Sequence, residues 1–170
     1  GVQSYLPQSN DHECAAEIEA LAHKNGVTFT GGGIWDMSRI WSGILATGPC
    51  TELKSIHISS LTDPQGQANS LQQIKQYCIS DPVEMFYEKG IDKNKAALAK
   101  KTIPEMVLRA LGYTILESTA RIEPVVYDVP VQTRYVPEGF FEAGLCVGVR
   151  FVCETTTEEG VIGTGRIEQR

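Results

Sequence analysis

The spacing of the apolar residues changes once along this chain, near Tyr113. Before that point apolar residues recur every three to four positions, which is typical of amphipathic helices. After it they alternate, most clearly in the series Leu145, Val147, Val149, Phe151 and Cys153. Helices followed by consecutive strands favour an α+β domain over a doubly wound fold. We therefore predict a mostly antiparallel or mixed β-sheet with helices packed on one face.

Helical spacing predicts five helices, in segments 11–25, 34–47, 71–78, 83–89 and 103–111. Gly26 and Gly112 are expected to end the first and the last of them, and Pro104 to lie in the first turn of the last. Between the first two helices lie a short β-rich run, Val27–Thr30, and the three glycines Gly31–Gly33. The run predicts a short strand leading into a glycine turn.

Strands are predicted in segments 51–61, 114–123, 125–135, 144–156 and 161–168. Residues 59–67 are expected to form a loop, because Asp-Pro and Gln-Gly interrupt them. Glu158, Glu159 and Gly160 would close the last two strands as a hairpin, with the glycine at positive φ.

The size and charge of the chain limit its class. A chain of 170 residues with 42% apolar residues fits one α+β domain over residues 1–170. A net charge of −6 argues against a nucleic-acid partner, and the basic run at Lys93, Lys95, Lys100 and Lys101 is interpreted as a solvated helix face or a loop. Membrane-length apolar runs and a secretion signal are both absent from the sequence. We expect a cytoplasmic protein with no membrane partner.

Five cysteines, with no CxxC pair, predict neither a disulfide framework nor a metal site, so each is expected to be a small buried apolar residue. His12, Glu13 and His23 lack the spacing of a zinc-binding helix and are expected to face solvent. His57 is interpreted as a hydrogen-bonded structural histidine. No metal is predicted.

The glycine turn before residue 34 could approach a ligand closely, since glycine has no side chain and a helix begins there. A dinucleotide fingerprint requires Gly or Ala three residues after its second glycine, whereas Asp36 stands there and would repel a pyrophosphate. Two interpretations stay open: a plain structural turn, or a turn that faces the substrate at the head of the helix.

The helix that follows carries a polar and aromatic cluster in its first turns: Trp35, Asp36, Ser38 and Arg39. Asp36 is favoured at a helix start by the macrodipole alone, and Trp41 is typical of a core position. A carboxylate beside an aromatic ring also suits recognition of an amino group. The cluster is therefore either structural or a candidate substrate contact.

Two stretches carry a family resemblance: residues 15–36 (AAEIEALAHKNGVTFTGGGIWD) and 104–129 (PEMVLRALGYTILESTARIEPVVYDV). They resemble the dihydrodipicolinate reductase-like dehydrogenases that act on amines and amino acids, which include 2,4-diaminopentanoate dehydrogenases and native amine dehydrogenases. In that group a helix leads into a glycine turn and a short Asp-containing helix, here Thr30 to Asp36. A Cys-Thr pair and a strand follow, here at Cys50 and Thr51.

The resemblance implies a two-domain enzyme whose N-terminal Rossmann domain binds NAD or NADP and is absent from this chain. This chain would be the C-terminal domain, which closes over a small amine or amino-acid substrate and forms a homo-oligomer through its sheet. It implies substrate contacts from Gly31, Gly32, Gly33, Trp35, Asp36, Ser38 and Arg39, with Gln3 and Tyr5 at the domain junction. The chain alone is not expected to be active.

One departure concerns catalysis. The opening residues resemble a family segment whose Glu is thought to handle the amine proton, and here that position is Val2. The chain also begins at Gly1 instead of Met and ends in a strand-like run, so we expect a fragment. Two hypotheses follow: the substrate-side domain of an NAD(P)-dependent oxidoreductase, or a non-catalytic oligomerisation or small-ligand-binding module from a degenerate family member.

Overall fold

The computed structural model describes residues 12–30, 34–63, 71–75, 77–88 and 93–170. The helices are α2 His12–Asn25, α3 Ile34–Thr47, α4 Leu71–Lys75, α5 Val83–Glu88 and α6 Lys93–Ala110. The strands are β1 Ser55–Thr62, β2 Ile115–Val126, β3 Val131–Gln132, β4 Phe140–Phe141, β5 Cys146–Thr157 and β6 Ile162–Gln169.

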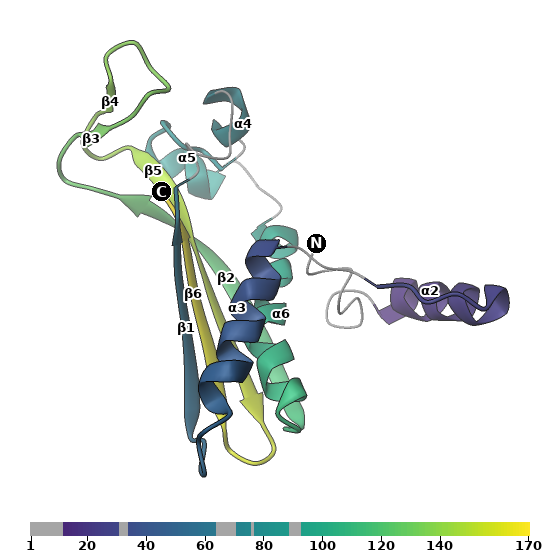
Figure 1. Ribbon diagram of the computed structural model, residues 1–170. Helices are drawn as coiled ribbons and strands as arrows, with labels where there is room; N and C mark the ends of the chain where they lie inside the picture. The colour runs from purple at the N-terminus through teal and green to yellow at the C-terminus, as the bar shows by residue number, and fades with distance from the viewer. Residues whose placement is uncertain (1–11, 31–33, 64–70, 76, 89–92) are drawn as a thin grey trace.

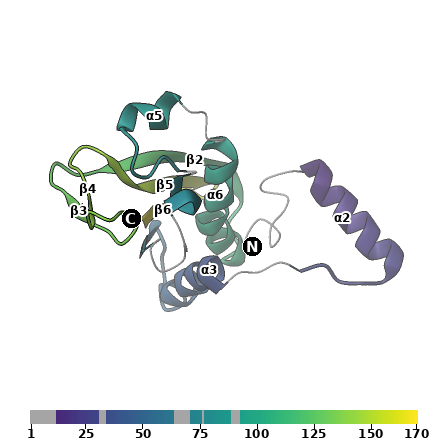
Figure 2. The same ribbon diagram turned by 90° about the horizontal axis from the view of Figure 1, so that it is seen from above.

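Four strands form the main sheet, in the order β1-β6-β5-β2 (Figure 1). β1 runs parallel to β6, and the other two pairs are antiparallel. Helices α3 and α6 cover one face of this sheet, while α2 stands apart from it (Figures 1 and 2). The predicted α+β fold, with a mixed sheet and helices on one face, is confirmed.

The core lies between α6 and the sheet. Ile103, Val107 and Leu108 of α6 are completely buried, and they belong to one apolar cluster with Val149 and Phe151 of β5. A Cβ atom on Gly163 of β6 would lie 2.9 Å from Leu108 Cδ1 and 3.2 Å from Pro104 Cβ. Glycine therefore lets α6 lie close against β6, because a larger residue would push the helix away.

A second, smaller apolar cluster lies where β2 ends and β5 begins. It contains Ile74, Ile79, Val125, Phe141 and Val147, with Tyr127 and Tyr135 packed against it. In β2, Ile122 belongs to the main core and Val125 to this cluster. At this end, therefore, the β3–β4 hairpin and α4 pack apolar side chains against the sheet, in addition to the packing of α6.

Several helices and strands lie where the sequence predicted them. α3 covers the predicted 34–47, α5 lies within the predicted 83–89, and the last two strands match within two residues. Gly160 has a φ of 81° in the hairpin, as predicted. At the end of α6, Gly112 has a φ of 89°, and the Tyr113 N–H donates to the Leu108 carbonyl at 3.0 Å.

Other predictions were wrong. Val27–Thr30 is exposed and forms no strand, because nothing in the described residues lies beside it to pair with. Residues 59–62 belong to β1 and not to a loop, since β6 pairs with them. The predicted break between residues 123 and 125 does not exist: β2 runs through Pro124 to Val126. β2 is an outer strand of the sheet, where proline is tolerated because one side needs no hydrogen bond.

Two helix predictions also need correction. α6 starts at Lys93, so Pro104 lies inside it and not in its first turn. The basic run therefore lies on a helix, one of the two alternatives predicted for it, and Lys100 Nζ lies 6.0 Å from the centroid of the Phe151 ring. The predicted 71–78 helix ends at Lys75, and Cys78 adopts a φ of 56° in the turn that follows.

None of the helices in the described part of the chain is both long and apolar enough to span a bilayer.

Candidate functional site

Five of the predicted substrate contacts lie outside the described residues: Gly31, Gly32, Gly33, Gln3 and Tyr5. Trp35 and Asp36 lie in the first turn of α3, as predicted, although only their backbone is described. Val2 also lies outside the described part of the chain.

Arg39 and Ser38 line one groove between α3 and β1. Arg39 Nε donates to Ser60 Oγ at 2.9 Å, and Nη2 donates to Thr62 Oγ1 at 3.3 Å. The groove holds about 490 Å³ and continues along Ser42 and Ala46 of α3. Arg39 therefore connects the first turns of α3 to the carboxyl end of β1, and its two bonds hold the start of this helix in position.

His57 is hydrogen-bonded, as predicted. Its Nδ1 lies within hydrogen-bond distance of Thr164 Oγ1, and Nε2 lies 3.1 Å from Ser59 Oγ. The ring is exposed on β1 and both nitrogens have hydroxyl partners. A role as a structural histidine is consistent with these contacts.

A cavity of about 250 Å³ lies in the second apolar cluster. We call it the hairpin cavity, because the β3–β4 hairpin forms one wall. Its apolar walls are Leu61, Ile74, Ile79, Tyr127, Val131, Tyr135, Phe141 and Val147, and its polar groups are Asp63, Gln132, Thr133 and Arg170. Sequence reasoning missed it because residues 125–135 were assigned to a strand. The available signal was the set of aromatic residues at 127, 135, 140 and 141, in a stretch rich in turn residues.

Backbone hydrogen bonds hold the hairpin over the sheet. The Thr133 N–H donates to the Gly139 carbonyl at 2.9 Å, and the Gly144 N–H donates to the Tyr127 carbonyl at 2.8 Å. The Tyr135 N–H donates to Thr133 Oγ1 at 3.2 Å. The wall is therefore a defined structure, because these backbone groups are paired with one another.

Arg170 closes one side of the hairpin cavity. Its guanidinium lies 5.2 Å from the Tyr127 ring centroid, and Nε donates to Glu168 Oε1 at 2.6 Å. The backbone at this point passes directly over Gly148, where a Cβ atom would lie 2.1 Å from the Gln169 carbonyl oxygen. Glycine at 148 is thus required to place Arg170 at the cavity.

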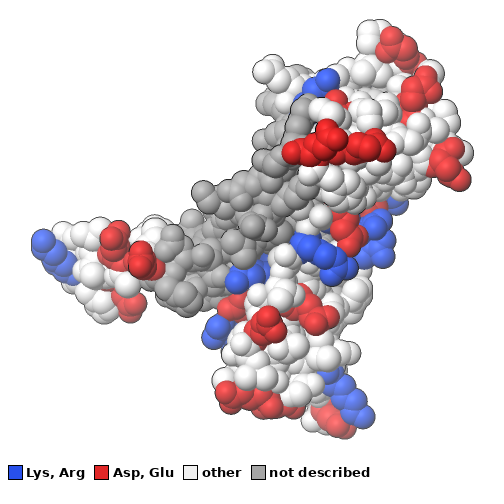
Figure 3. Space-filling view, turned by 180° about the vertical axis from the view of Figure 1, so that it is seen from behind, with Lys and Arg blue, Asp and Glu red and all other residues white. Residues whose placement is uncertain are grey.

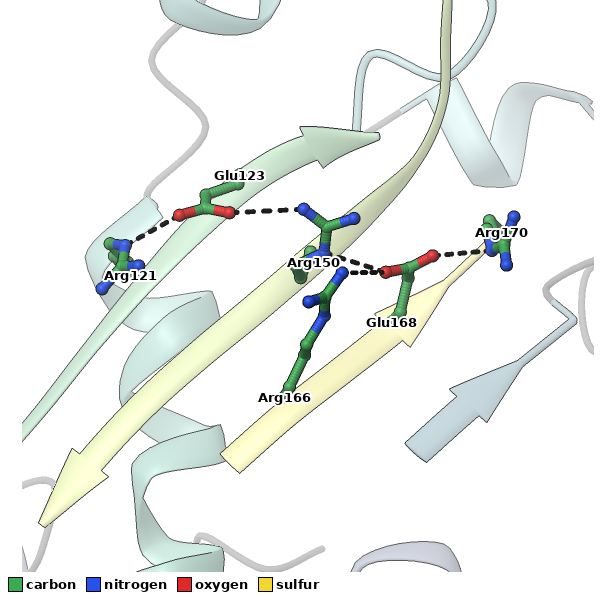
Figure 4. Close-up of polar contacts among 6 residues, drawn as sticks. All are labelled: Arg121, Glu123, Arg150, Arg166, Glu168 and Arg170. Atoms are coloured by element: carbon green, nitrogen blue, oxygen red, sulfur yellow. Dashed lines mark hydrogen bonds and ion pairs between the residues drawn. The ribbon is translucent and has the colours of Figure 1, made fainter. Parts of the chain in front are cut away.

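The sheet face opposite α3 and α6, which we call the open face, carries an alternating row of charges (Figure 4). Arg150 bridges Glu123, at 3.6 Å, and Glu168, at 2.8 Å. Arg121 bonds Glu123 at 2.8 Å, and this hydrogen bond is the main cause of a lowered pKa for the Glu123 carboxyl. Arg166 lies 3.7 Å from Glu168. Each carboxylate on this row has at least two arginine neighbours.

Comparison with known proteins bears directly on the resemblance. No protein-family model matches the chain. The chain is 33% identical over 150 residues to 2,4-diaminopentanoate dehydrogenase from Acetoanaerobium sticklandii, which covers 84% of this chain and 40% of that protein. The resemblance inferred from the sequence is confirmed. The fold matches the structure of an amine dehydrogenase from Mycobacterium smegmatis with a TM-score of 0.77, at 18% identity, over 99% of this chain and 49% of that one.

These matches define what the chain is similar to. It spans 40% of the curated relative's length and about half of the solved amine dehydrogenase chain. At 18% identity the solved structure shows a shared fold only. The domain described here therefore corresponds to a part of such proteins.

Three cysteines are buried, as predicted, and two are not. Cys78, Cys146 and Cys153 are buried, whereas Cys14 and Cys50 are exposed, which corrects the expectation for those two. Burial raises the pKa of the Cys146 thiol to about 11 and that of Cys153 to about 12. These two thiols stay protonated near neutral pH, so they are poor nucleophiles. Among the described residues no group of three metal-ligating side chains occurs.

Proposed function

We propose that this chain is the substrate-side, C-terminal domain of an NAD(P)-dependent oxidoreductase that acts on an amine, amino acid or imine. The match to a 2,4-diaminopentanoate dehydrogenase over 84% of the chain carries this proposal. The shared fold with an amine dehydrogenase supports it. A cytoplasmic location stays a prediction.

The glycine run Gly31–Gly33 lacks the sequence pattern of a dinucleotide-binding loop. Asp36 stands three residues after Gly33, where such loops carry glycine or alanine, and a carboxylate would repel a pyrophosphate. NAD or NADP would therefore be held by a separate N-terminal domain of the full-length protein. The role of this chain is to bind and orient the substrate.

Turnover by the full-length protein tests the proposal. We expect loss of NADH or NADPH absorbance with a carbonyl compound and ammonia, and a reduction of at least tenfold in Asp36→Ala. Glu52→Ala is the control, because Glu52 is 75% exposed and pairs at 3.9 Å with Lys54 before β1. Equal activity in both variants would remove Asp36 from the proposal. No cofactor consumption with any such substrate would favour the alternative, a non-catalytic oligomerisation or ligand-binding module.

We further propose that two copies of the chain associate through the open face. This face carries both signs of charge in alternation, so a twofold arrangement can bring Arg150 of one copy near Glu168 of the other. Leu61 and Ile162 are 63% and 43% exposed, and their positions in the sheet register place them on the same face. Burial of these apolar side chains against a second copy would stabilise the association.

Light scattering after size-exclusion chromatography measures this association. We expect a dimer or tetramer that becomes monomeric in the variant Ile162→Arg. The control is Leu45→Arg, because Leu45 is 72% exposed but lies on α3. A monomeric wild-type chain, or equal dissociation by the control, would exclude the open face as the interface.

A further inference from the structure

Helix α2 and the segment after it lie apart from the rest of the molecule. In Figures 1 and 2, α2 projects away from α3, α6 and the sheet, and residues 27–30 turn back from its far end toward α3. Neither α2 nor residues 27–30 contribute a side chain to the two apolar clusters of the described residues. Both cores of the domain are therefore built without residues 12–30, which we call the αβ arm.

Local hydrogen bonds set the angle between the helix and the extended segment. Gly26 has a φ of 61°, and its N–H donates to the His23 carbonyl at 3.2 Å. The Val27 N–H donates to the Ala22 carbonyl at 3.0 Å. This pair of bonds is a Schellman motif, which ends a helix and redirects the chain. The arm is therefore a helix–turn–extended unit whose shape does not depend on the body of the domain.

The helix of the arm has a polar side and an apolar side. Ile18 and Ala22 lie one turn apart on one side, beside Leu21, whereas Glu13 and His23 lie across the helix. Leu21 is 59% exposed. Charged side chains are visible on α2 where it projects at the left of Figure 3. This arrangement is typical of a helix that packs its apolar side against another structure.

The extended segment has the properties of a strand without a neighbour. Val27 and Phe29 are two residues apart, so they share one face of an extended chain, and they are 61% and 51% exposed. β-branched and aromatic residues of this kind favour pleated sheets. Among the described residues, none makes a backbone hydrogen bond to Thr28 or Phe29. Composition and backbone therefore both indicate pairing with a strand outside the described residues.

These features define the partner that the αβ arm fits. A helix followed directly by a strand is the second half of a βαβ unit, the unit that builds parallel sheets. The partner therefore needs a sheet edge for residues 27–29 and an apolar sheet face for the apolar side of α2.

A second copy of this chain matches these requirements poorly. Helices α3 and α6 cover one face of its sheet (Figure 1). The open face carries the ion pairs of Glu123, Arg150 and Glu168, and an apolar helix side would strip water from these charges.

We propose that the αβ arm docks on the nucleotide-binding domain of the full-length protein. Residues 27–29 add a strand to the edge of its parallel sheet, and α2 packs its apolar side on the face of that sheet. The partner is the domain that the proposed function requires, so the inference rests on that function. The match to 2,4-diaminopentanoate dehydrogenase covers 40% of that protein, so more than half of its length lies outside the match.

Docking brings the substrate side of this chain to the cofactor. In open parallel sheets, ligands bind outside the carboxyl ends of the strands. Thr30 stands at the carboxyl end of the added strand, and Gly31–Gly33 and the first turn of α3 follow it in sequence. The residues that the resemblance assigns to substrate contacts then lie at the sheet edge where the cofactor is held, and the body of this domain begins with α3.

Hydrogen–deuterium exchange of the 170-residue chain and of the full-length protein tests the docking. We expect the peptide that contains Thr28 and Phe29 to exchange at least about tenfold more slowly in the full-length protein, because pairing to a sheet protects backbone amides. Equal exchange rates in the two proteins would overturn the proposal. Protection that is already present in the 170-residue chain would also overturn it, and a rise of this protection with concentration would identify a second copy as the occupant.

Thermal melting of Phe29→Ser provides a second readout. In the 170-residue chain the change should shift the Tm by less than about 1 °C, since Phe29 is exposed and outside both apolar clusters. In the full-length protein it should lower the Tm by about 4 °C or more, because an apolar contact between domains is lost. Leu116→Ser is the matched control: Leu116 is 63% exposed on β2, so its effect should be the same in both proteins. An equal shift for Phe29→Ser in the two proteins would contradict the docking.

Failure of the docking and failure of the proposed function look different. If the full-length protein oxidises NADH or NADPH but residues 28–29 exchange as fast as in the 170-residue chain, the docking alone is wrong. If these residues are protected only in the full-length protein but no cofactor is consumed, the docking stands and the proposed oxidoreductase function fails.

Discussion

Replacing Gly148 with alanine is the sharpest test of how the end of the sheet is built. A Cβ atom at this position would lie 2.1 Å from the Gln169 carbonyl oxygen and 2.8 Å from Arg170 Cα. Both are backbone atoms, so no side-chain rotation relieves the overlap. The chain at residues 169–170 must move by about 1 Å to reach ordinary contact distance.

That movement disrupts two neighbouring contacts. Val149 pairs with Gln169 in the β5–β6 ladder, and the Arg170 N–H donates to the Thr62 carbonyl at 3.1 Å. Overpacking typically costs about 1–3 kcal/mol, and each hydrogen bond contributes about 0.5–1.5 kcal/mol. We expect a loss of about 3 kcal/mol in the free energy of unfolding, or about 6–12 °C in Tm for a domain of this size.

Urea denaturation and thermal melting measure the loss, with Gly165→Ala as the matched control. Gly165 lies in the same sheet, but a Cβ atom there would lie 3.5 Å from Cys153 Cβ, an ordinary contact. That control should be neutral or stabilising by about 0.4–1 kcal/mol, since alanine restricts the unfolded chain. If Gly148→Ala unfolds at the same urea concentration as this control, the close approach is not a constraint and the reasoning is wrong.

Three further outcomes are expected. At pH 8, iodoacetamide should modify the two exposed cysteines and spare the three buried ones, as measured by mass spectrometry of the native protein. Burial raises the pKa of the Cys153 thiol from 9.0 to about 12, so the unfolded chain loses this proton at a lower pH than the folded chain does. The free energy of unfolding should therefore fall between about pH 9 and 12. Cys153→Ala should flatten this decline, measured as the urea midpoint against pH. Arg109→Leu should destabilise the chain by about 1–2 kcal/mol, because Glu105 is 4% exposed. Arg121→Leu should cost under about 1 kcal/mol, because Glu123 is 34% exposed, and equal losses would contradict this reasoning.

The elements that sequence reasoning placed correctly have local causes. α3 begins after three glycines, and the β5–β6 hairpin turns at Gly160, so residues within a few positions decide both. Pro124 misled the prediction because its effect depends on where β2 lies in the sheet. A proline breaks a central strand but not an outer one, and the order of strands is a tertiary property.

The hairpin cavity was beyond local prediction for a similar reason. Its walls come from Leu61, from Ile74 and Ile79, from residues 127–147 and from Arg170, which only the folded sheet brings together. No spacing rule joins residues so far apart in sequence. The turn with positive φ at Cys78 and Ser80 was not predicted either, since backbone hydrogen bonds join Ser80 and Asp81 to Cys146 at the start of β5, far away in sequence.

The predicted site and the one that sequence reasoning missed meet at the carboxyl end of β1. Arg39 of α3 bonds Thr62 Oγ1, and the Thr62 carbonyl accepts the Arg170 N–H. The next residue, Asp63, lines the hairpin cavity. The first turns of α3, which the resemblance assigns to substrate contacts, are thus joined to the cavity through a single residue.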